Sequence, residues 1–374
     1  MPKQVIVQPS IEAVEIINTP IPEAGDNDVI IKVVVAGSNP KDWKYPLWKG
    51  WPHNSGDDIA GIVHAVGKDV YEFKPGDRVA ALHRAGKENG GYAEYSVAPH
   101  WTTFHLPQHV TFEEAATVPT AALTAAIALY VDMKLPLPQV EVALAGENKM
   151  PILIYGVTSA VGAFAAKLAR LSGLYPIIGI AGRASDFAQT LADYVVDYRE
   201  GDDAIVKRVE EILKQKGLGN KVTHVFDAIS EGGTLETTLR FVDDNGGIIS
   251  TVLPPSLFAK DPEGFKYPPG MAAINSALPR VHSTHKDFGF LWSRFLGRLL
   301  ADGRLKPHPF EIVPGGLHGV LKGLQKLKEG KASATKYVYN IEDTPDSPPT
   351  HETSTSKRPE DKQKHQFQAF PFPP

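Results

Sequence analysis

The residues best suited to chemistry lie in the turn GVTSAVG, residues 156–162, between an apolar strand and a helix. Gly156 can take the positive φ that a sharp turn needs, and small residues leave the backbone open to close approach. The free N–H groups and the dipole of the following helix attract an anion. Two glycines six apart are a weaker signal than G-x-G-x-x-G, and such a turn also serves tight packing alone. We expect a cofactor diphosphate to contact Gly156, Thr158, Ser159, Ala160, Val161 and Gly162.

The end of the next strand indicates which dinucleotide would bind. Folds that prefer NAD usually place an acid there, which binds the ribose 2′-hydroxyl. In this chain the strand 175–180 runs into Arg183 and Ser185, with no carboxylate before Asp186. A guanidinium and a hydroxyl suit the 2′-phosphate of NADPH, and we expect Tyr198 to cover the adenosine side. The alternative is that Arg183 is a solvated loop residue.

The elements that must position this turn follow from hydrophobic periodicity. The strand 152–155, the helix after the turn and the strand 175–180 form one βαβ unit. Strands 194–197, 222–229 and 247–253 then alternate with helices 203–216 and 233–242, which predicts a doubly wound, mostly parallel sheet. A β-rich domain precedes it, with strands at 4–8, 14–17, 29–35, 59–66, 78–82, 91–97 and 103–106, followed by helices at 111–118 and 120–131.

The C-terminal part is predicted less regularly. Residues 254–283 are rich in proline and glycine and show little periodicity, so we interpret them as an insertion or a cap. A helix at 287–302, a strand at 310–313, a helix at 317–328 and a closing strand at 336–341 follow. From residue 343 the composition predicts a disordered tail.

Composition limits the classes of protein. The 374 residues are 42% hydrophobic with a net charge of −4, which is typical of a globular protein with two domains and argues against binding of nucleic acid. The absence of cysteine excludes disulfides, thiolate zinc sites and cysteine nucleophiles. We see no signal-peptide pattern and no apolar run of bilayer length, and therefore expect a cytoplasmic enzyme without membrane contact.

Several segments resemble a known superfamily. GDDIAGIVHAVGKDVYEFKPGDRVAA (56–81) and GGYAEYSVAP (90–99) are similar to the medium-chain dehydrogenases/reductases, and SNPKDWK (38–44) with YGVTSAVG (155–162) resembles their zinc-independent fungal branch, which includes trans-acting enoyl reductases. The resemblance implies a GroES-like β-barrel catalytic domain at 1–118 and 310–342, and a Rossmann NADPH-binding domain at 119–309, with the tail at 343–374.

A catalytic zinc is not expected. Zinc-dependent members offer a cysteine, a Gly-His-Glu site and a second cysteine or acid, whereas this chain has Ser38 at the first position and Gly56-Asp57-Asp58 at the second. A catalytic zinc needs three converging ligands. His53 and His64 are near in sequence, but His64 lies within a strand pattern.

The resemblance also implies the site residues. It places Ser38 and Lys41 in the substrate cavity with Asn39 beside them, and Thr120 and Thr124 near the nicotinamide. Lys41 would stabilise an enolate oxygen or donate a proton, or alternatively pair with Asp42 or a phosphate. The threonines could instead be cap and helix-core residues. Lys336 falls where relatives place a basic residue near the cofactor, and Leu253 completes the expected cofactor contacts.

We therefore predict an NADPH-dependent enoyl reductase acting on an unsaturated thioester or related metabolite in fungal secondary metabolism, with a polyketide synthase as a possible partner. A quinone or enone reductase for small free substrates and a non-catalytic NADPH-binding protein are the alternatives. The loop with His83, Arg84 and Lys87 could meet a phosphopantetheine, an acidic carrier or solvent. The aromatic residues at 43–51 and 288–292 suit either a core or an acyl cleft. A monomer is favoured, because residues 254–283 would obstruct the sheet edge through which relatives dimerise.

Overall fold

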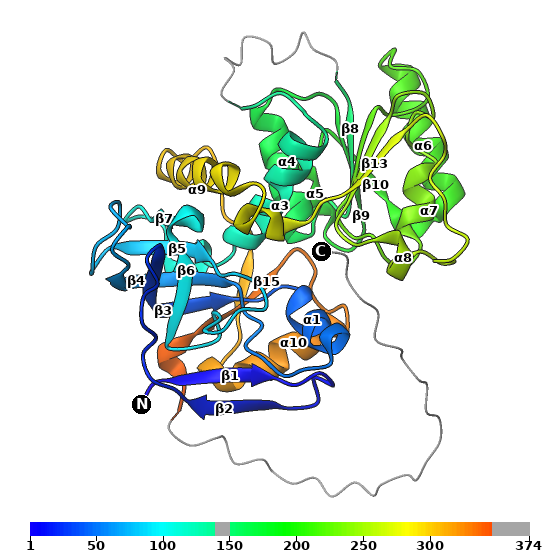
Figure 1. Ribbon diagram of the computed structural model, residues 1–374. Helices are drawn as coiled ribbons and strands as arrows, with labels where there is room; N and C mark the ends of the chain where they lie inside the picture. Colours follow the sequence, from blue (N-terminus) through cyan, green and yellow to red (C-terminus); the bar gives the residue numbers. More distant parts are fainter. Residues whose placement is uncertain (139–149, 346–374) are drawn as a thin grey trace, which may run out of the picture.

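The protein is described by a computed structural model that covers residues 1–138 and 150–345 and contains two large sheets (Figure 1). The N-terminal strands and the last strands of the chain build the lower part of the molecule in Figure 1, and the parallel sheet with its helices builds the upper part. This is the GroES-like domain joined to a Rossmann domain that the sequence predicts.

The catalytic domain is a curved, mostly antiparallel sheet in the order β14-β15-β3-β4-β5-β7, with β6 paired to β3. The strands predicted up to residue 106 all form, although β6 begins at Tyr95 and not at residue 91. The strands of this sheet are β3 (Asp28–Gly37), β4 (Asp58–Val66), β5 (Arg78–Leu82), β6 (Tyr95–Pro99), β7 (Thr103–His105), β14 (Phe310–Ile312) and β15 (Lys336–Asn340). A separate two-stranded sheet is formed by β1 (Lys3–Val7) and β2 (Val14–Asn18).

The Rossmann sheet has the order β10-β9-β8-β11-β12-β13, and every neighbouring pair is parallel. Its order reverses beside β8, which is where ligands bind in doubly wound sheets. The strands are β8 (Ile152–Tyr155), β9 (Ile177–Ala181), β10 (Tyr194–Asp197), β11 (His224–Asp227), β12 (Ile248–Thr251) and β13 (Ala272–Asn275). The helices between them are α4 (Ala160–Leu171), α5 (Ser185–Leu191), α6 (Asp202–Gln215) and α7 (Thr234–Leu239).

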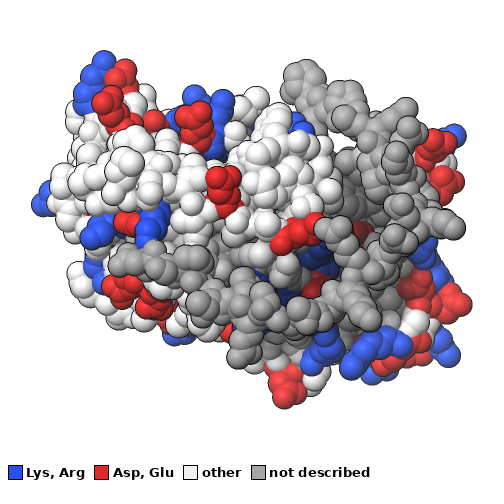
Figure 2. Space-filling view, turned by 90° about the horizontal axis from the view of Figure 1, so that it is seen from below, with Lys and Arg blue, Asp and Glu red and all other residues white. Residues whose placement is uncertain are grey.

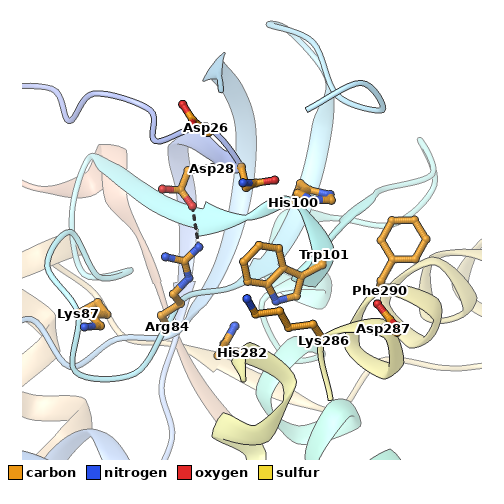
Figure 3. Close-up of a pocket in the computed structure, with 11 residues that line it drawn as sticks. Asp26, Asp28, Arg84, Lys87, His100, Trp101, His282, Lys286, Asp287 and Phe290 are labelled. Atoms are coloured by element: carbon orange, nitrogen blue, oxygen red, sulfur yellow. Dashed lines mark hydrogen bonds and ion pairs between the residues drawn. The ribbon is translucent and has the colours of Figure 1, made fainter. Parts of the chain in front are cut away.

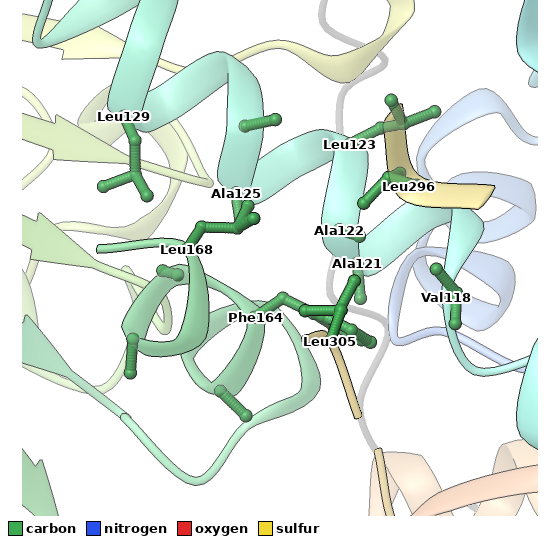
Figure 4. Close-up of a cluster of buried hydrophobic side chains, with 14 of the residues drawn as sticks. Val118, Ala121, Ala122, Leu123, Ala125, Leu129, Phe164, Leu168, Leu296 and Leu305 are labelled. Carbon is green, nitrogen blue, oxygen red and sulfur yellow. The ribbon is translucent and has the colours of Figure 1, made fainter. Parts of the chain in front are cut away.

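Buried apolar helices connect the two domains. The helices α2 (Phe112–Ala115) and α3 (Pro119–Ala126), with a π-helical turn at Ile127–Asp132, enter the Rossmann domain, and α9 (Lys286–Ala301) packs against them. Small alanines on α3 let α4 approach closely, with Phe164 and Leu168 filling the space (Figure 4). The segment Phe112–Asp132 is apolar and long enough to span a bilayer, contrary to our expectation, but 83% of it is buried. It is therefore a core helix.

The interpretation of residues 254–283 was wrong, and the helix α1 was not predicted. Residues 254–283 are not an insertion without periodicity, because they contain α8 (Pro255–Phe258) and the edge strand β13. A four-residue strand between prolines gives too short a pattern to recognise. The helix α1 (Lys41–Lys49) was missed, since Pro46 lies inside it. The tail was expected from residue 343, yet Thr344 Oγ1 accepts a hydrogen bond from the Leu317 N–H at 2.9 Å. The rest of the predicted tail lies outside the described residues.

Candidate active site

The turn after β8 has a geometry that fits a diphosphate. Gly156 has a φ of 74°, in the left-handed region that favours glycine. Ser159 caps α4, and its Oγ accepts a hydrogen bond from the Gly162 N–H at 3.1 Å. A Cβ on Gly162 would lie 2.2 Å from the Gly156 carbonyl oxygen, so glycine is required for this close packing. The other small or apolar residues of the turn are partly exposed: Thr158, Ala160 and Val161. The first-turn N–H groups of α4 thus suit an anion.

The carboxyl end of β9 carries the residues expected around the adenosine. Arg183 is exposed, and its Nη2 donates a hydrogen bond to the Gly330 carbonyl at 2.7 Å. Because Gly330 follows α10 (Val320–Lys328) in the catalytic domain, this hydrogen bond joins the Rossmann domain to the catalytic domain. Tyr198 lies against Gly182, where a Cβ would be 2.5 Å from its ring, and Ser185 begins α5. The fold therefore gathers Arg183, Ser185 and Tyr198 at one edge of the sheet.

A buried polar network in the catalytic domain is centred on Asp58. Lys336 Nζ, at the start of β15, forms an ion pair with Asp58 and donates to Asn39 Oδ1 at 3.1 Å. Asn39 Nδ2 donates to Asp58 Oδ2 at 2.8 Å, and the Thr120 N–H donates to Asp58 Oδ1 at 2.7 Å. Asp58 is 0% exposed and Lys336 is 3% exposed. The network joins β3, β4, α3 and β15, and the side chains of Asn39 and Lys336 are committed to it.

Lys41 occupies a second charged cluster beside this network. Its Nζ lies 2.6 Å from Asp57 Oδ2 and 3.0 Å from Asp42 Oδ1, and it donates to the Ser55 carbonyl at 2.6 Å. Burial alone would lower the pKa of Lys41, but the two carboxylates outweigh burial and raise it. Burial, together with the charge of a neighbouring carboxylate, raises the pKa of both carboxyls to about 6, although the Lys41 ammonium acts in the opposite direction. The ion pair with Asp42, one alternative from the sequence, is therefore present, and the Lys41 side chain remains 26% exposed.

The hydroxyls expected near the nicotinamide differ in their contacts. Ser38 Oγ donates to the Tyr337 carbonyl at 2.9 Å and is buried. Thr124 Oγ1 donates to the Thr120 carbonyl at 2.7 Å, as a helix-core threonine does. Thr120 Oγ1 is buried and has no hydrogen-bond partner among the residues that the structure describes. Since a buried polar group without a partner is costly, Thr120 is the hydroxyl most available to a ligand.

The Rossmann domain contributes a group of polar residues around Asp227 that the sequence analysis did not single out. Asp227, the last residue of β11, accepts hydrogen bonds from the Ser230 N–H at 2.8 Å and Thr234 Oγ1 at 2.7 Å. Burial raises its pKa to about 6. Ser230 Oγ in turn accepts from the Val252 N–H at 3.0 Å, next to the partly exposed Leu253. An acid at the carboxyl end of a parallel strand was the available signal, because such ends meet at the ligand-binding edge.

The helix α1 of the catalytic domain contacts the Rossmann domain close to these residues. Lys44 Nζ lies 2.7 Å from Glu231 Oε2, and it also lies over the Phe258 ring at 5.3 Å. Trp48 packs edge-on against Phe258, with the ring centroids 5.5 Å apart. Part of the aromatic cluster near α1 is therefore an interdomain contact. In the second aromatic group, Trp292 is buried and stacks on Tyr130, so it is core.

Replacing Lys44 by Met should raise the KM for the cofactor about threefold, because one contact that holds the domains together is lost while Glu231 remains partly solvated. Steady-state kinetics at low and high salt would measure this, and the difference from the native protein should shrink as salt screens the pair. The matched control is Lys214→Met, on the exposed face of α6. A KM that is identical in the native protein and the Lys44 variant would contradict the role of the pair.

Charged and potentially metal-ligating side chains of residues 1–138 and 150–345 form no cluster that would hold a metal ion. On the face drawn in Figure 2, basic and acidic residues are interspersed. Within residues 1–138 and 150–345, no group of three His, Cys, Asp or Glu side chains is placed to hold a metal ion. Asp57 and Asp58, at the position of a zinc-site motif in relatives, are instead paired with Lys41 and Lys336. The residues present therefore do not fit a catalytic zinc.

Comparison with known protein families and structures identifies the superfamily to which the fold belongs. Residues 25–108 match the family described as an alcohol dehydrogenase GroES-like domain, and residues 160–262 match the family described as zinc-binding dehydrogenase. The crystal structure of the CurK enoyl reductase superposes with a TM-score of 0.73 at 20% identity, covering 90% of this chain and 98% of that one. The two domains and the dinucleotide turn are those of a medium-chain dehydrogenase/reductase.

Relatives that are similar in sequence show to which branch of this superfamily the chain belongs. The chain is 41% identical to the trans-enoyl reductase fsr4 of Gibberella fujikuroi, over 82% of this chain and 89% of the relative. It is 31% identical to the trans-enoyl reductase resD of Aspergillus sclerotiorum, over 86% and 95%, and 30% identical to RAP2 of Pyricularia oryzae, over 87% and 94%. The chain belongs to the fungal trans-enoyl reductases of secondary metabolism, as the sequence predicts, and it acts with a nicotinamide cofactor.

Proposed function

We propose that this trans-enoyl reductase uses NADPH and reduces the C=C bond of an α,β-unsaturated acyl thioester that a polyketide synthase carries. The observation that carries the cofactor proposal is the exposed Arg183 at the end of β9, with Ser185 beside it and no carboxylate between them. The carrier-bound substrate is supported by the family, in which trans-acting members work with a synthase. We favour a thioester over a free quinone because the sequence relatives of this chain are trans-enoyl reductases.

The residues in the cleft suggest a division of roles. The nicotinamide, when bound, supplies a hydride for the substrate β-carbon, so negative charge develops on the thioester oxygen. Lys41, held as an ammonium by Asp42 and Asp57, would stabilise that oxygen, with the Thr120 hydroxyl as a second donor. Ser38 would position the neighbouring backbone through its bond to Tyr337. The α-carbon then takes a proton, which the Lys41 ammonium or a water molecule would supply, while Asp57 keeps Lys41 charged.

The first test is consumption of NADPH, compared with NADH, against enoyl thioesters, simple enones and quinones. Selective reduction of thioesters with NADPH is the expected result. Turnover of quinones or enones in preference to thioesters would instead favour the free-substrate alternative. Tight binding of NADPH without turnover of a carrier-bound thioester would support a non-catalytic protein and overturn the proposal.

Lys41→Met is expected to lower kcat about tenfold with the thioester, since one charged donor to the developing oxyanion is removed. The conservative variant Lys41→Arg should recover part of this rate. If Lys41→Met retains the native kcat, the ion pair with Asp42 and Asp57 is the only role of this lysine.

The same variant should also change how stability depends on pH. Asp42 and Asp57 have pKa values of about 6 in the folded protein, above their ordinary values, because of burial. The folded state therefore binds more protons than the unfolded state between about pH 4 and 6, and the free energy of unfolding falls as pH rises through this window. Without the Lys41 ammonium this fall should be steeper. Urea unfolding at pH 5 and pH 7 would measure it, with Lys207→Met on α6 as control.

A further inference from the structure

A cavity lies at the seam of the two domains, apart from the turn that fits the diphosphate. It has a volume of about 720 Å³ and is called the seam cavity below. The catalytic domain contributes Asp28 at the start of β3, Arg84 and Lys87 after β5, and Trp101 after β6, whereas His282 and Lys286 come from the start of α9 and the turn before it (Figure 3). A ligand in this cavity would therefore contact both domains.

Cationic side chains gather around one indole in the seam cavity. The Arg84 guanidinium carbon lies 5.0 Å from the centre of the Trp101 ring, and Lys286 Nζ lies 5.1 Å from it. The Trp101 Nε1 donates to the Val281 carbonyl at 2.9 Å, which fixes the ring across the domain seam. In Figure 3 the Lys286 side chain runs along Trp101 toward Arg84. The arrangement therefore places two cations over one partly exposed indole ring.

Some of the charged side chains that line the seam cavity form ion pairs, and others do not. Asp28 pairs with Arg84 at 2.9 Å, which occupies one of the five N–H donors of the guanidinium. Asp26 pairs with Lys68 outside the cavity at 3.1 Å. Within the described ranges, neither Lys87 nor Lys286 has a carboxylate within 4 Å, and Asp287 is the remaining lining acid. Two ammonium groups and the outer donors of Arg84 are therefore available to an anion.

The seam cavity is connected to the candidate active site through one short loop. His83, which precedes Arg84, is buried, and its N–H donates to the Asp57 carbonyl at 2.8 Å. Asp57 in turn holds Lys41 at 2.6 Å. The loop therefore contributes the Arg84 side chain to the cavity, while the backbone of His83 contacts the backbone of Asp57 in the Lys41 cluster.

We propose that the seam cavity binds the phosphate of the phosphopantetheine arm through which the carrier presents the substrate; this rests on the proposed function. A phosphate diester suits the ammonium of Lys286, the ammonium of Lys87 and the outer N–H groups of Arg84. The gem-dimethyl group of the pantetheine next to the phosphate suits the face of Trp101. Binding there brings together groups from both domains around one carrier arm.

The test compares one unsaturated acyl group on pantetheine, on 4′-phosphopantetheine and on a phosphopantetheinylated carrier protein. The native protein should prefer the phosphorylated ester over pantetheine by about tenfold in kcat/KM, and Lys286→Gln should remove most of this preference. In the Lys286→Gln variant, kcat/KM with the carrier-bound acyl group should also fall by about tenfold. Calorimetric titration with free 4′-phosphopantetheine gives a readout independent of turnover, and Lys207→Gln on the exposed face of α6 is the matched control.

The outcomes separate the two proposals. If no pantetheine ester is reduced, the proposed thioester reduction itself fails. If all esters are reduced and Lys286→Gln leaves the phosphate preference unchanged, the seam cavity is not the phosphate site. A loss confined to the free 4′-phosphopantetheine ester, with the carrier-bound group unaffected, would overturn the assignment to the carrier arm. A parallel loss in Lys87→Gln would support it.

Discussion

Arg183→Asp is expected to lower kcat/KM with NADPH by about a hundredfold, while the value with NADH changes by less than about threefold. The guanidinium of Arg183 stands at the end of β9, where a 2′-phosphate would lie. Its removal deletes charge-assisted hydrogen bonds to a dianion, and the introduced carboxylate repels the same group. With NADH the carboxylate can accept a hydrogen bond from the ribose 2′-hydroxyl. The ratio of the two kcat/KM values is therefore the quantity to measure.

A control separates this electrostatic effect from a structural one. Arg183 also donates to the Gly330 carbonyl across the cleft, so a variant could act by loosening the domains. Loosening would impair both cofactors equally, whereas loss of a phosphate contact impairs NADPH alone. Arg208→Gln, on the exposed face of α6, should leave both values unchanged. An equal loss with NADPH and NADH in Arg183→Asp would withdraw the assignment of NADPH.

The sequence predicts those elements of the fold that are determined by a short-range pattern of residues. The βαβ unit around Gly156 combines an apolar strand, a small-residue turn and an amphipathic helix, and each feature is visible in the sequence. The edge strand β13 could not be predicted, because Ala272–Asn275 has little intrinsic β preference and forms by pairing with β12. The helix α1 contains Pro46 and several aromatic residues, which local propensity disfavours.

Candidate site residues could be proposed from the sequence, but most of their contacts with one another could not be predicted. The resemblance to the family brought Lys41, Asn39 and Lys336 together, yet it assigned them to substrate and cofactor. In the structure, Lys41 is held by two acids and Lys336 pairs with Asp58, 278 positions away in the chain. The pair with Asp42 was one alternative from the sequence, whereas the pairs with Asp57 and Asp58 depend on tertiary contacts that no local pattern encodes. For the same reason the sequence did not reveal that α1 contacts Glu231 across the cleft.

Lys336→Met is expected to lower the free energy of unfolding by about 3–5 kcal/mol, because removing one member of a buried ion pair leaves the other charge uncompensated. Asp58 is 0% exposed and would retain the Asn39 amide and the Thr120 N–H as its donors. Methionine nearly preserves the volume of the lysine side chain, so a cavity contributes little. Urea unfolding at pH 7 measures the change, and Lys326→Met on α10, whose pair with Glu311 is exposed, should lose less than about 1 kcal/mol.

The double variant Lys336→Met/Asp58→Asn distinguishes a charge effect from general disruption of β15. If the cost of Lys336→Met is the isolated Asp58 carboxylate, removing that charge in the same molecule should recover part of the lost stability. If the double variant is less stable than either single variant by the sum of their losses, the two side chains contribute independently and the buried pair is not what stabilises this junction. At this junction β15 also pairs with β3 along the sheet, so recovery in the double variant would mean that the buried charge pair adds to this strand pairing in holding β15 in place.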